Sequence, residues 1–147
     1  VNNFNLINKY LKKEKKLGIS TTKPYKKFYL RMLKFRKKIK KLLYNFKKNN
    51  KSVHIYGAST KGNTIIQWLK IDRKDIPYAA DRNPKKWGTK TIGSKIEIIS
   101  EGTSKSMKPQ YYLVLPWHFK KEFLKREKKF LNDGGKMIFP LPTIKIY

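Results

Sequence analysis

The sequence has no cysteine and few acidic residues: 9 Asp and Glu stand against 37 Lys and Arg, which gives a formal charge of +28. Without thiols the chain can form neither a disulfide framework nor a thiolate zinc site, and we expect no metal site. The absence of cysteine also makes a cytoplasmic location the default expectation. No apolar run approaches the ~20 residues that a membrane-spanning helix needs. We therefore expect a soluble protein whose 147 residues hold one domain-sized core.

Arginine is scarce as well, because only five of the 37 basic residues are Arg. Residues 1–50 carry 17 basic residues and one acid, and residues 51–147 carry 20 and eight, so the positive charge runs along the whole chain. Nucleic-acid sites cluster their cations and rely on guanidinium geometry. We interpret the lysines mainly as a solvated surface and do not expect nucleic acid as the partner.

Helical spacing of apolar residues organises residues 1–50. A helix is predicted from Phe4 to Leu17, with Gly18 as its stop. A second helix is predicted by apolar residues at alternating steps of three and four, namely Tyr25, Phe28, Met32, Phe35, Ile39, Leu42 and Phe46. Two interpretations of this seam are open: a basic amphipathic helix for an anionic membrane or nucleic acid, and a helix that packs against another helix or domain while its lysines face water. We favour the second. Because the chain starts at Val1 within a helical pattern, we expect it to belong to a longer polypeptide.

From residue 51 the pattern changes to short apolar runs that alternate with helical stretches. This alternation predicts an α/β fold: a Rossmann-like three-layer domain over 51–147 with a mostly parallel sheet, preceded by the helical segment 1–50. Ligand groups in such folds gather at the carboxyl ends of the strands. Strands are expected over Val53–Tyr56, Tyr78–Ala80, Ile96–Ile99, Tyr111–Leu115, Lys136–Phe139 and, at an edge, Thr143–Tyr147; helices are expected over Lys61–Leu69 and Phe119–Leu131.

A glycine-rich turn follows the first predicted strand, with the spacing Gly-x-Ser-x-x-Gly at Gly57, Ser59 and Gly62. Gly57 permits a tight exit from the strand, Ser59 offers a hydroxyl, and Gly62 lets the helix lie close to the sheet. A phosphate would meet the helix N-terminus, with Lys61 as a nearby cation. Ser59 replaces the middle glycine of the dinucleotide fingerprint, and Asn63 stands where a Walker A motif has lysine. The turn is therefore either a phosphate cradle or a well-made strand-to-helix connection.

Three further polar residues are candidates. Asp81 ends the second strand, 24 residues after Gly57, where an acid grips ribose hydroxyls in dinucleotide folds; it can equally form a turn with the Asn-Pro pair that follows. His118 lies beside Trp117 at a strand end, as a ligand contact, a proton carrier or a structural residue. His54 lies inside a strand, and packing is its expected role. No Ser-His-Asp order or paired carboxylate assigns a catalytic residue.

Several segments stand in a recognisable order: Ile55–Thr64, Ala80–Gly88, Gly93 with Ile96–Ile99, Leu113–His118 and Gly134–Pro142. This order resembles the C-terminal domain of S-adenosylmethionine-dependent sugar C-methyltransferases. The resemblance implies that a zinc-binding domain and an adenosylmethionine-binding domain precede this one, and that a nucleotide-linked deoxyketosugar binds between the latter and the present domain. S-adenosylmethionine would be the cofactor of the full-length enzyme and would bind outside this chain. The catalytic bases belong to the central domain in that family, so no residue here inherits their role. That family often has Trp-Asn where this chain has Trp117-His118.

The resemblance implies a substrate-side module with a nucleotide-sugar or carbohydrate substrate and an upstream adenosylmethionine-binding domain as partners. The diphosphate and sugar would be positioned through Ser59, Lys61, Asn63 and Thr64. Two other functions stay open: a basic protein that binds nucleic acid or a membrane surface, and a Rossmann-like module for another nucleotide or coenzyme A. The full set of expected substrate-binding residues is Gly57, Ser59, Lys61, Gly62, Asn63, Thr64, Asp81, Trp117 and His118.

Overall fold

The computed structural model describes residues 3–147, which divide into two compact units, one up to Lys38 and the other from Ile39 onward. This boundary lies within a long helix, α2 (Lys23–Lys48). The last turns of α2 therefore belong to the second unit. The division at residue 50, which composition suggested, stays a prediction. Within the described residues no helix combines the length and the apolar character needed to cross a bilayer.

The first unit contains α1 (Phe4–Leu17) and the beginning of α2. Gly18 adopts a left-handed conformation with φ of 65° and its N–H bonds back to the carbonyls of Glu14 and Lys15, which confirms the predicted helix stop. The hydroxyl of Tyr25 donates to the carbonyl of Ile19 at 2.8 Å and braces the connection between the helices. No residue of α1 is buried. The large exposed apolar side chains of this unit are Phe4, Leu6, Ile7, Tyr10, Leu11, Leu17, Ile19, Tyr25, Phe28, Tyr29 and Leu30.

The end of α2 packs into the second unit. Ile39 and Leu43 are buried, and the ring of Phe46 stacks on Tyr111 with 4.0 Å between ring centroids. The ammonium of Lys40 forms an ion pair with Asp75 at 2.9 Å. Packing is therefore confirmed for this part of the predicted seam.

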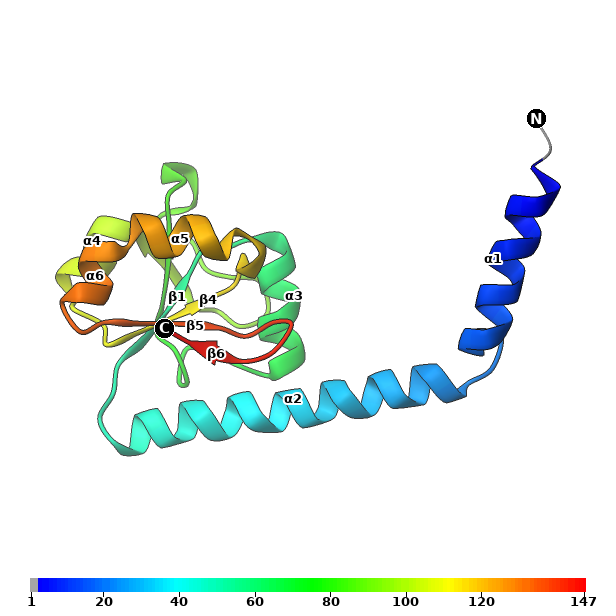
Figure 1. Cartoon of the computed structure of the whole chain (residues 1–147). Helices are drawn as coiled ribbons and strands as arrows, with labels where there is room; N and C mark the ends of the chain where they lie inside the picture. The colour runs from blue at the N-terminus through cyan, green and yellow to red at the C-terminus, as the bar shows by residue number, and fades with distance from the viewer. Residues whose placement is uncertain (1–2) are drawn as a thin grey trace. The chain divides into compact units, whose positions relative to one another are not determined.

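The second unit is built on one six-stranded sheet in the order β3-β2-β1-β4-β5-β6. Neighbouring strands are parallel except for the β5–β6 pair, which is antiparallel (Figure 1). The chain order reverses between β1 and β4, which is the position where Rossmann-like folds bind ligands. The strands are β1 (Val53–Tyr56), β2 (Tyr78–Asp81), β3 (Glu97–Ser100), β4 (Tyr111–Val114), β5 (Lys136–Phe139) and β6 (Lys145–Ile146).

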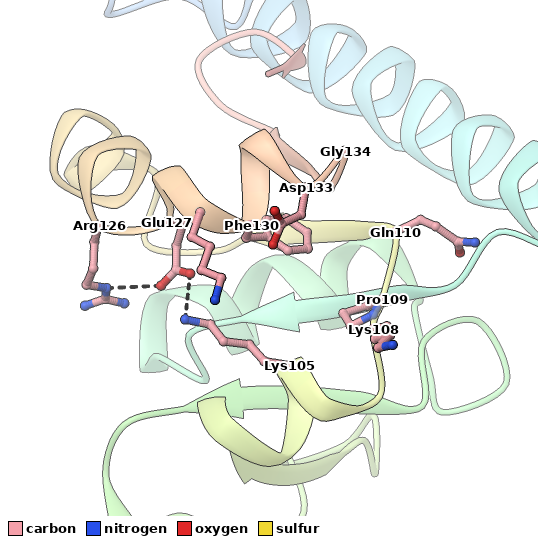
Figure 2. A pocket seen from close by; sticks show the side chains of 11 residues that line it. Lys105, Lys108, Pro109, Gln110, Arg126, Glu127, Phe130, Asp133 and Gly134 are labelled. Atoms are coloured by element: carbon pink, nitrogen blue, oxygen red, sulfur yellow. Dashed lines mark ion pairs between the residues drawn. The ribbon is translucent and has the colours of Figure 1, made fainter.

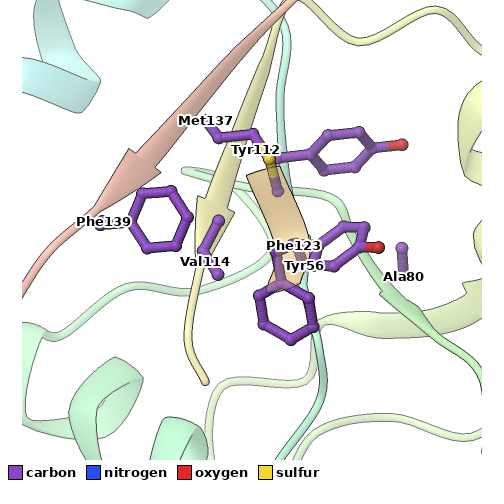
Figure 3. Packing of buried hydrophobic residues seen from close by; sticks show 7 residues of the cluster. All are labelled: Tyr56, Ala80, Tyr112, Val114, Phe123, Met137 and Phe139. Atoms are coloured by element: carbon purple, nitrogen blue, oxygen red, sulfur yellow. The ribbon is translucent and has the colours of Figure 1, made fainter. Parts of the chain in front are cut away.

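Helices cover both faces of this sheet. On one face Tyr56 and Tyr112 pack with Phe123 and with residues from β2, β4 and β5, as Figure 3 shows, and Figure 1 places α4, α5 and α6 on that side. Side chains alternate along a strand, so Ile55 and Leu113 point to the opposite face, that of α3. The predicted Rossmann-like α/β domain, with a mostly parallel sheet preceded by helices, is confirmed. The helices of this unit are α3 (Thr60–Leu69), α4 (Glu101–Ser106), α5 (Lys120–Arg126) and α6 (Lys128–Asn132), and shorter 3-10 turns span Pro84–Lys86 and Trp117–Phe119.

The segment predicted as one helix over Phe119–Leu131 is divided. A 3-10 turn leads into α5, and Glu127 separates α5 from α6 with φ of −95° and ψ of 23°. The side chain of Glu127 is 2% exposed and turns toward Lys105 and Tyr56. The break thus accompanies the burial of a charged group, which apolar spacing does not reveal.

Candidate functional site

The turn from β1 to α3 lies at the topological switch point, beside the segment that leaves β4. Gly57 has φ of +85°, a conformation that side chains disfavour, and a Cβ at this position would meet Pro116 Cγ at 2.6 Å. Its N–H donates to the Ala80 carbonyl at 2.8 Å and ties the turn to β2. A glycine is therefore required here by conformation and by the close approach of the β4 exit.

The start of α3 is capped by Ser59, whose Oγ accepts the N–H of Gly62 at 3.1 Å. A Cβ on Gly62 would lie 2.6 Å from Leu115 Cβ, so glycine lets the helix begin directly against the sheet. The N–H groups of Thr60 and Lys61 have no intrahelical partner because they open the helix. Together with the helix dipole they favour an anion in front of the turn.

A cavity of 440 Å³ opens on the β4 side of the turn. It brings three of the predicted residues together: Ser59, Lys61 and His118. Glu122 stands in the same lining, so one carboxylate accompanies these groups. The full lining is Ser59, Thr60, Lys61, Pro116, His118, Phe119, Glu122 and Phe123.

A second cavity, of 230 Å³, opens on the other side of the same turn. Asn63 lines it, and the Oδ1 atom of Asn63 is buried without a hydrogen-bond partner in the described part of the chain. Lys86 and Lys90 bring two cations to the lining. The full lining is Ala58, Ser59, Thr60, Asn63, Ile66, Lys86, Lys90, Thr91, Ile92 and Ile98. The two cavities share Ser59 and Thr60, so the turn is accessible to a ligand from both sides.

Asp81 does not line either cavity. Its Oδ2 accepts the N–H of Ala58 at 2.9 Å, and its Oδ1 accepts the N–H of Asn83 at 2.9 Å. Lys86 Nζ lies 3.2 Å from Oδ2 and donates to the Ala58 carbonyl at 3.0 Å. These contacts directly support the interpretation that Asp81 forms a turn.

Other predicted residues shape the site without lining the cavities. Gly57 and Gly62 provide close backbone approach. The Thr64 hydroxyl faces the carbonyl of Thr60 within the helix at 3.4 Å. Trp117 packs against the apolar cluster of Figure 3.

Three charged lining residues were not predicted: Lys86, Lys90 and Glu122. The Asn-Pro pair could have indicated that Lys86 returns to the site. Asn83 caps a 3-10 turn that has proline at its start, and this turn brings Lys86 back toward Asp81. No comparable pattern marks the other two.

A larger cavity, of 650 Å³, lies elsewhere, near the segments that precede β4 and β5 (Figure 2). Three of its charged lining residues are paired: Glu127 accepts from Lys105 at 2.7 Å and from the Tyr56 hydroxyl at 2.7 Å, and Arg126 contacts both Glu127 and Glu101. Burial alone would raise the pKa of Glu127, but the hydrogen bonds from Lys105 and Tyr56 and the positive charges of Lys105 and Arg126 together outweigh it and lower the pKa. We interpret this cavity as bordering a structural ion network.

His54 belongs to the same buried polar region. Its Nδ1 lies 2.9 Å from Ser104 Oγ, which in turn lies 2.8 Å from the hydroxyl of Tyr112. Burial lowers the pKa of His54, so it is neutral at pH 7. His54 is 4% exposed, and the predicted packing role is confirmed.

Comparison with known proteins identifies the family to which this chain belongs. A family model described as the C-methyltransferase C-terminal domain matches residues 2–142. The C-methyltransferase NovU of Streptomyces niveus is 31% identical over 136 residues, which cover 92% of this chain and 32% of NovU. The chain thus spans about a third of the length of that relative.

Proposed function

Because the chain belongs to the family of C-methyltransferase C-terminal domains, we propose that it is the substrate-side domain of an S-adenosylmethionine-dependent methyltransferase that acts on a nucleotide-linked sugar or related carbohydrate. The observation that supports a nucleotide-linked substrate is the position of the β1–α3 turn, which lies at the switch point with a cavity on each side. Open α/β sheets bind their ligands at this place. The proposal extends the family assignment to a particular surface of this chain.

The turn has the chemistry that a diphosphate needs. The free N–H groups of Thr60 and Lys61 and the ammonium of Lys61 can bind phosphate oxygens. Ser59 and Asn63 offer hydrogen-bonding groups to the sugar or to the second phosphate. His118 lines the β4-side cavity and can contact the sugar there.

The methyl-transfer chemistry is proposed to lie in an upstream domain, in the same or another chain. S-adenosylmethionine supplies an electrophilic methyl group, which a carbanion or enolate next to a keto group accepts after loss of a proton. The contribution of the present residues is to bind and orient the substrate, since holding reactants in a productive geometry lowers the barrier to reaction.

Thermal unfolding of the chain with separate ligands tests this proposal. A nucleoside-diphosphate hexose at about one hundred times its Kd should stabilise the fold by ~2.7 kcal/mol. For a chain of this size that corresponds to a rise in Tm of roughly 8–11 °C. Lys61→Met should weaken the effect, whereas Lys128→Met on α6, which makes the same charge change away from both cavities, should preserve it.

Other ligands discriminate the alternatives. Stabilisation by NAD or coenzyme A, without any response to nucleotide sugars, would contradict the proposed substrate. A response to heparin that vanishes at about 0.3 M salt, with no sugar specificity, would indicate a polyanion-binding protein instead.

A further inference from the structure

Both backbone polar groups of one residue in the turn, Ala58, are held by side chains from the β2 exit. The N–H of Ala58 donates to Asp81 Oδ2 at 2.9 Å, and the carbonyl of Ala58 accepts from Lys86 Nζ at 3.0 Å. Lys86 and Asp81 also pair with each other at 3.2 Å. The three groups form a closed ring of contacts, which fixes the orientation of the backbone between Gly57 and Ser59.

The carboxylate of Asp81 has little capacity left for a ligand. Its second oxygen accepts the N–H of Asn83 at 2.9 Å, and its side chain is 12% exposed. The indole N–H of Trp87 donates to the Asp81 carbonyl at 2.7 Å and holds the same residue through its backbone. In dinucleotide-binding folds the acid at this position stays free to accept the ribose 2′-hydroxyl.

We infer that Asp81 and Lys86 are positioning residues of the β1–α3 turn and that Asp81 does not grip a ribose. The ligand is then held at this turn through an anionic group, without the adenosine-ribose contact of dinucleotide sites. The ligand part of this inference rests on the proposed function. The positioning part rests only on the contacts of Ala58.

The contacts of Asp81 and Lys86 with Ala58, called the clamp below, determine which backbone amides remain for a ligand. Ala58 N–H is occupied by Asp81, Gly62 N–H by the Ser59 side chain and Asn63 N–H by the Ser59 carbonyl. Among the amides that open α3, those of Thr60 and Lys61 are left for an anion. The 230 Å³ cavity lies on the side of Ala58 and contains the unpartnered Asn63 Oδ1 and the side chain of Lys86.

Amide NMR of the ligand-free chain tests the clamp directly. Lys86→Met should shift the amide resonance of Ser59, whose nitrogen shares the peptide with the Ala58 carbonyl, and should speed hydrogen exchange at Ala58. Lys85→Met is the matched control, because it makes the same charge change one residue away at an exposed side chain, and only Lys86 of the two donates to the Ala58 carbonyl among the described residues. Lys86→Arg should restore part of the wild-type spectrum.

Titration with a nucleoside diphosphate then tests the consequence for binding. The Kd should rise about tenfold in Lys86→Met and stay within about twofold in Lys85→Met, a difference of the size produced by one charge-assisted hydrogen bond. Unchanged Ala58 and Ser59 signals in Lys86→Met, or equal weakening in both variants, would overturn the positioning role.

A separate binding experiment tests whether Asp81 contacts a ribose. The chain should show no saturable binding of NAD. If NAD binds, and Asp81→Asn abolishes that binding while inorganic pyrophosphate still binds, Asp81 is a ribose ligand and the inference is wrong. Should the wild-type chain bind no diphosphate at all, the proposed function fails, whereas the ligand-free spectra still decide whether Lys86 holds the turn.

Discussion

Replacing Glu127 by alanine should be among the most destabilising single changes in the second unit. The carboxylate is 2% exposed and accepts from the Tyr56 hydroxyl at 2.7 Å and from Lys105 at 2.7 Å. A hydrogen bond to a charged group contributes about 1.5–3 kcal/mol. The Lys105 side chain is 44% exposed, so its ion pair adds at most about 1 kcal/mol after solvent screening.

The expected loss follows from what each former partner does next. Lys105 can return to water, but the Tyr56 O–H loses its acceptor, because Arg126 donates to the Tyr56 oxygen and accepts nothing from it. This donor belongs to a residue that is 1% exposed and is left unsatisfied. The unsatisfied Tyr56 donor, the lost ion pair and the space left beside the core together predict a loss of roughly 3 kcal/mol in the free energy of unfolding. Glu127→Gln, which keeps the shape and removes the charge, should lose about half of that.

Urea unfolding followed by circular dichroism measures these differences. Glu122→Ala on α5 is the matched control, since it removes the same charge from an exposed position and should change stability by at most about 0.5 kcal/mol. Equal stability of Glu127→Ala and Glu122→Ala would refute the argument.

The pH dependence of the same comparison checks the electrostatic part. The pKa of Glu127 is lowered on folding from its ordinary value of 4.5, so its contribution is complete well above that value and is lost as the pH falls through the folded-state pKa. The stability gap between wild type and Glu127→Gln should therefore be larger at pH 7 than below about pH 4. A gap that widens in acid would contradict the sign of the shift.

Two further outcomes follow from the packing and the buried histidine. Gly62→Ala should destabilise the fold by about 1–3 kcal/mol, because its new methyl would lie 2.6 Å from Leu115 Cβ. Gly102→Ala on α4 is the control and should be neutral or stabilising, because its Cβ would meet only a side-chain oxygen at 3.7 Å. Equal thermal stability of the two variants would contradict this prediction. His54 is buried and its pKa is lowered, so its protonation favours the unfolded state once the pH falls below about 6.5. The wild type should therefore lose stability between pH 7 and 5.5, and His54→Gln should lose less over that interval. The midpoints of urea unfolding at the two pH values measure this difference.

The strands of the second unit could be predicted because the sheet is buried on both faces. β1 and β5 have the predicted bounds, and the others differ from prediction by one or two residues at an end. A sheet covered on both sides gives short continuous apolar runs, which stand out among lysine-rich segments. The helix α4, Glu-Gly-Thr-Ser-Lys-Ser, was missed because it has no apolar periodicity and buries only Ser104. Its position is set by the contact of Ser104 with His54 and Tyr112, which the sequence does not display.

The candidate site was predictable to the extent that it depends on topology. Ser59, Lys61 and His118 line one cavity because the carboxyl ends of neighbouring parallel strands meet at one edge of the sheet. The role of Asp81 was not predictable, since an acid that grips ribose and an acid that holds a turn occupy the same place in the sequence. Their difference lies in the contacts with Ala58 and Lys86, and the latter residue reaches across 28 positions from a 3-10 turn.

In the proposed binding of an anionic ligand, the charge of the chain and the geometry of the turn would have different effects. With 37 basic and 9 acidic residues, at least 28 cations cannot be matched one to one with a carboxylate of this chain. Such an excess raises the local concentration and the association rate of any anion, but it does not distinguish one anion from another. Under the proposed function, discrimination between anions would come from fixed donors in the cavities beside Ser59 and Thr60. We therefore expect salt to weaken the binding of all anions through the rate of association, and substitutions at the turn to change which anion is preferred.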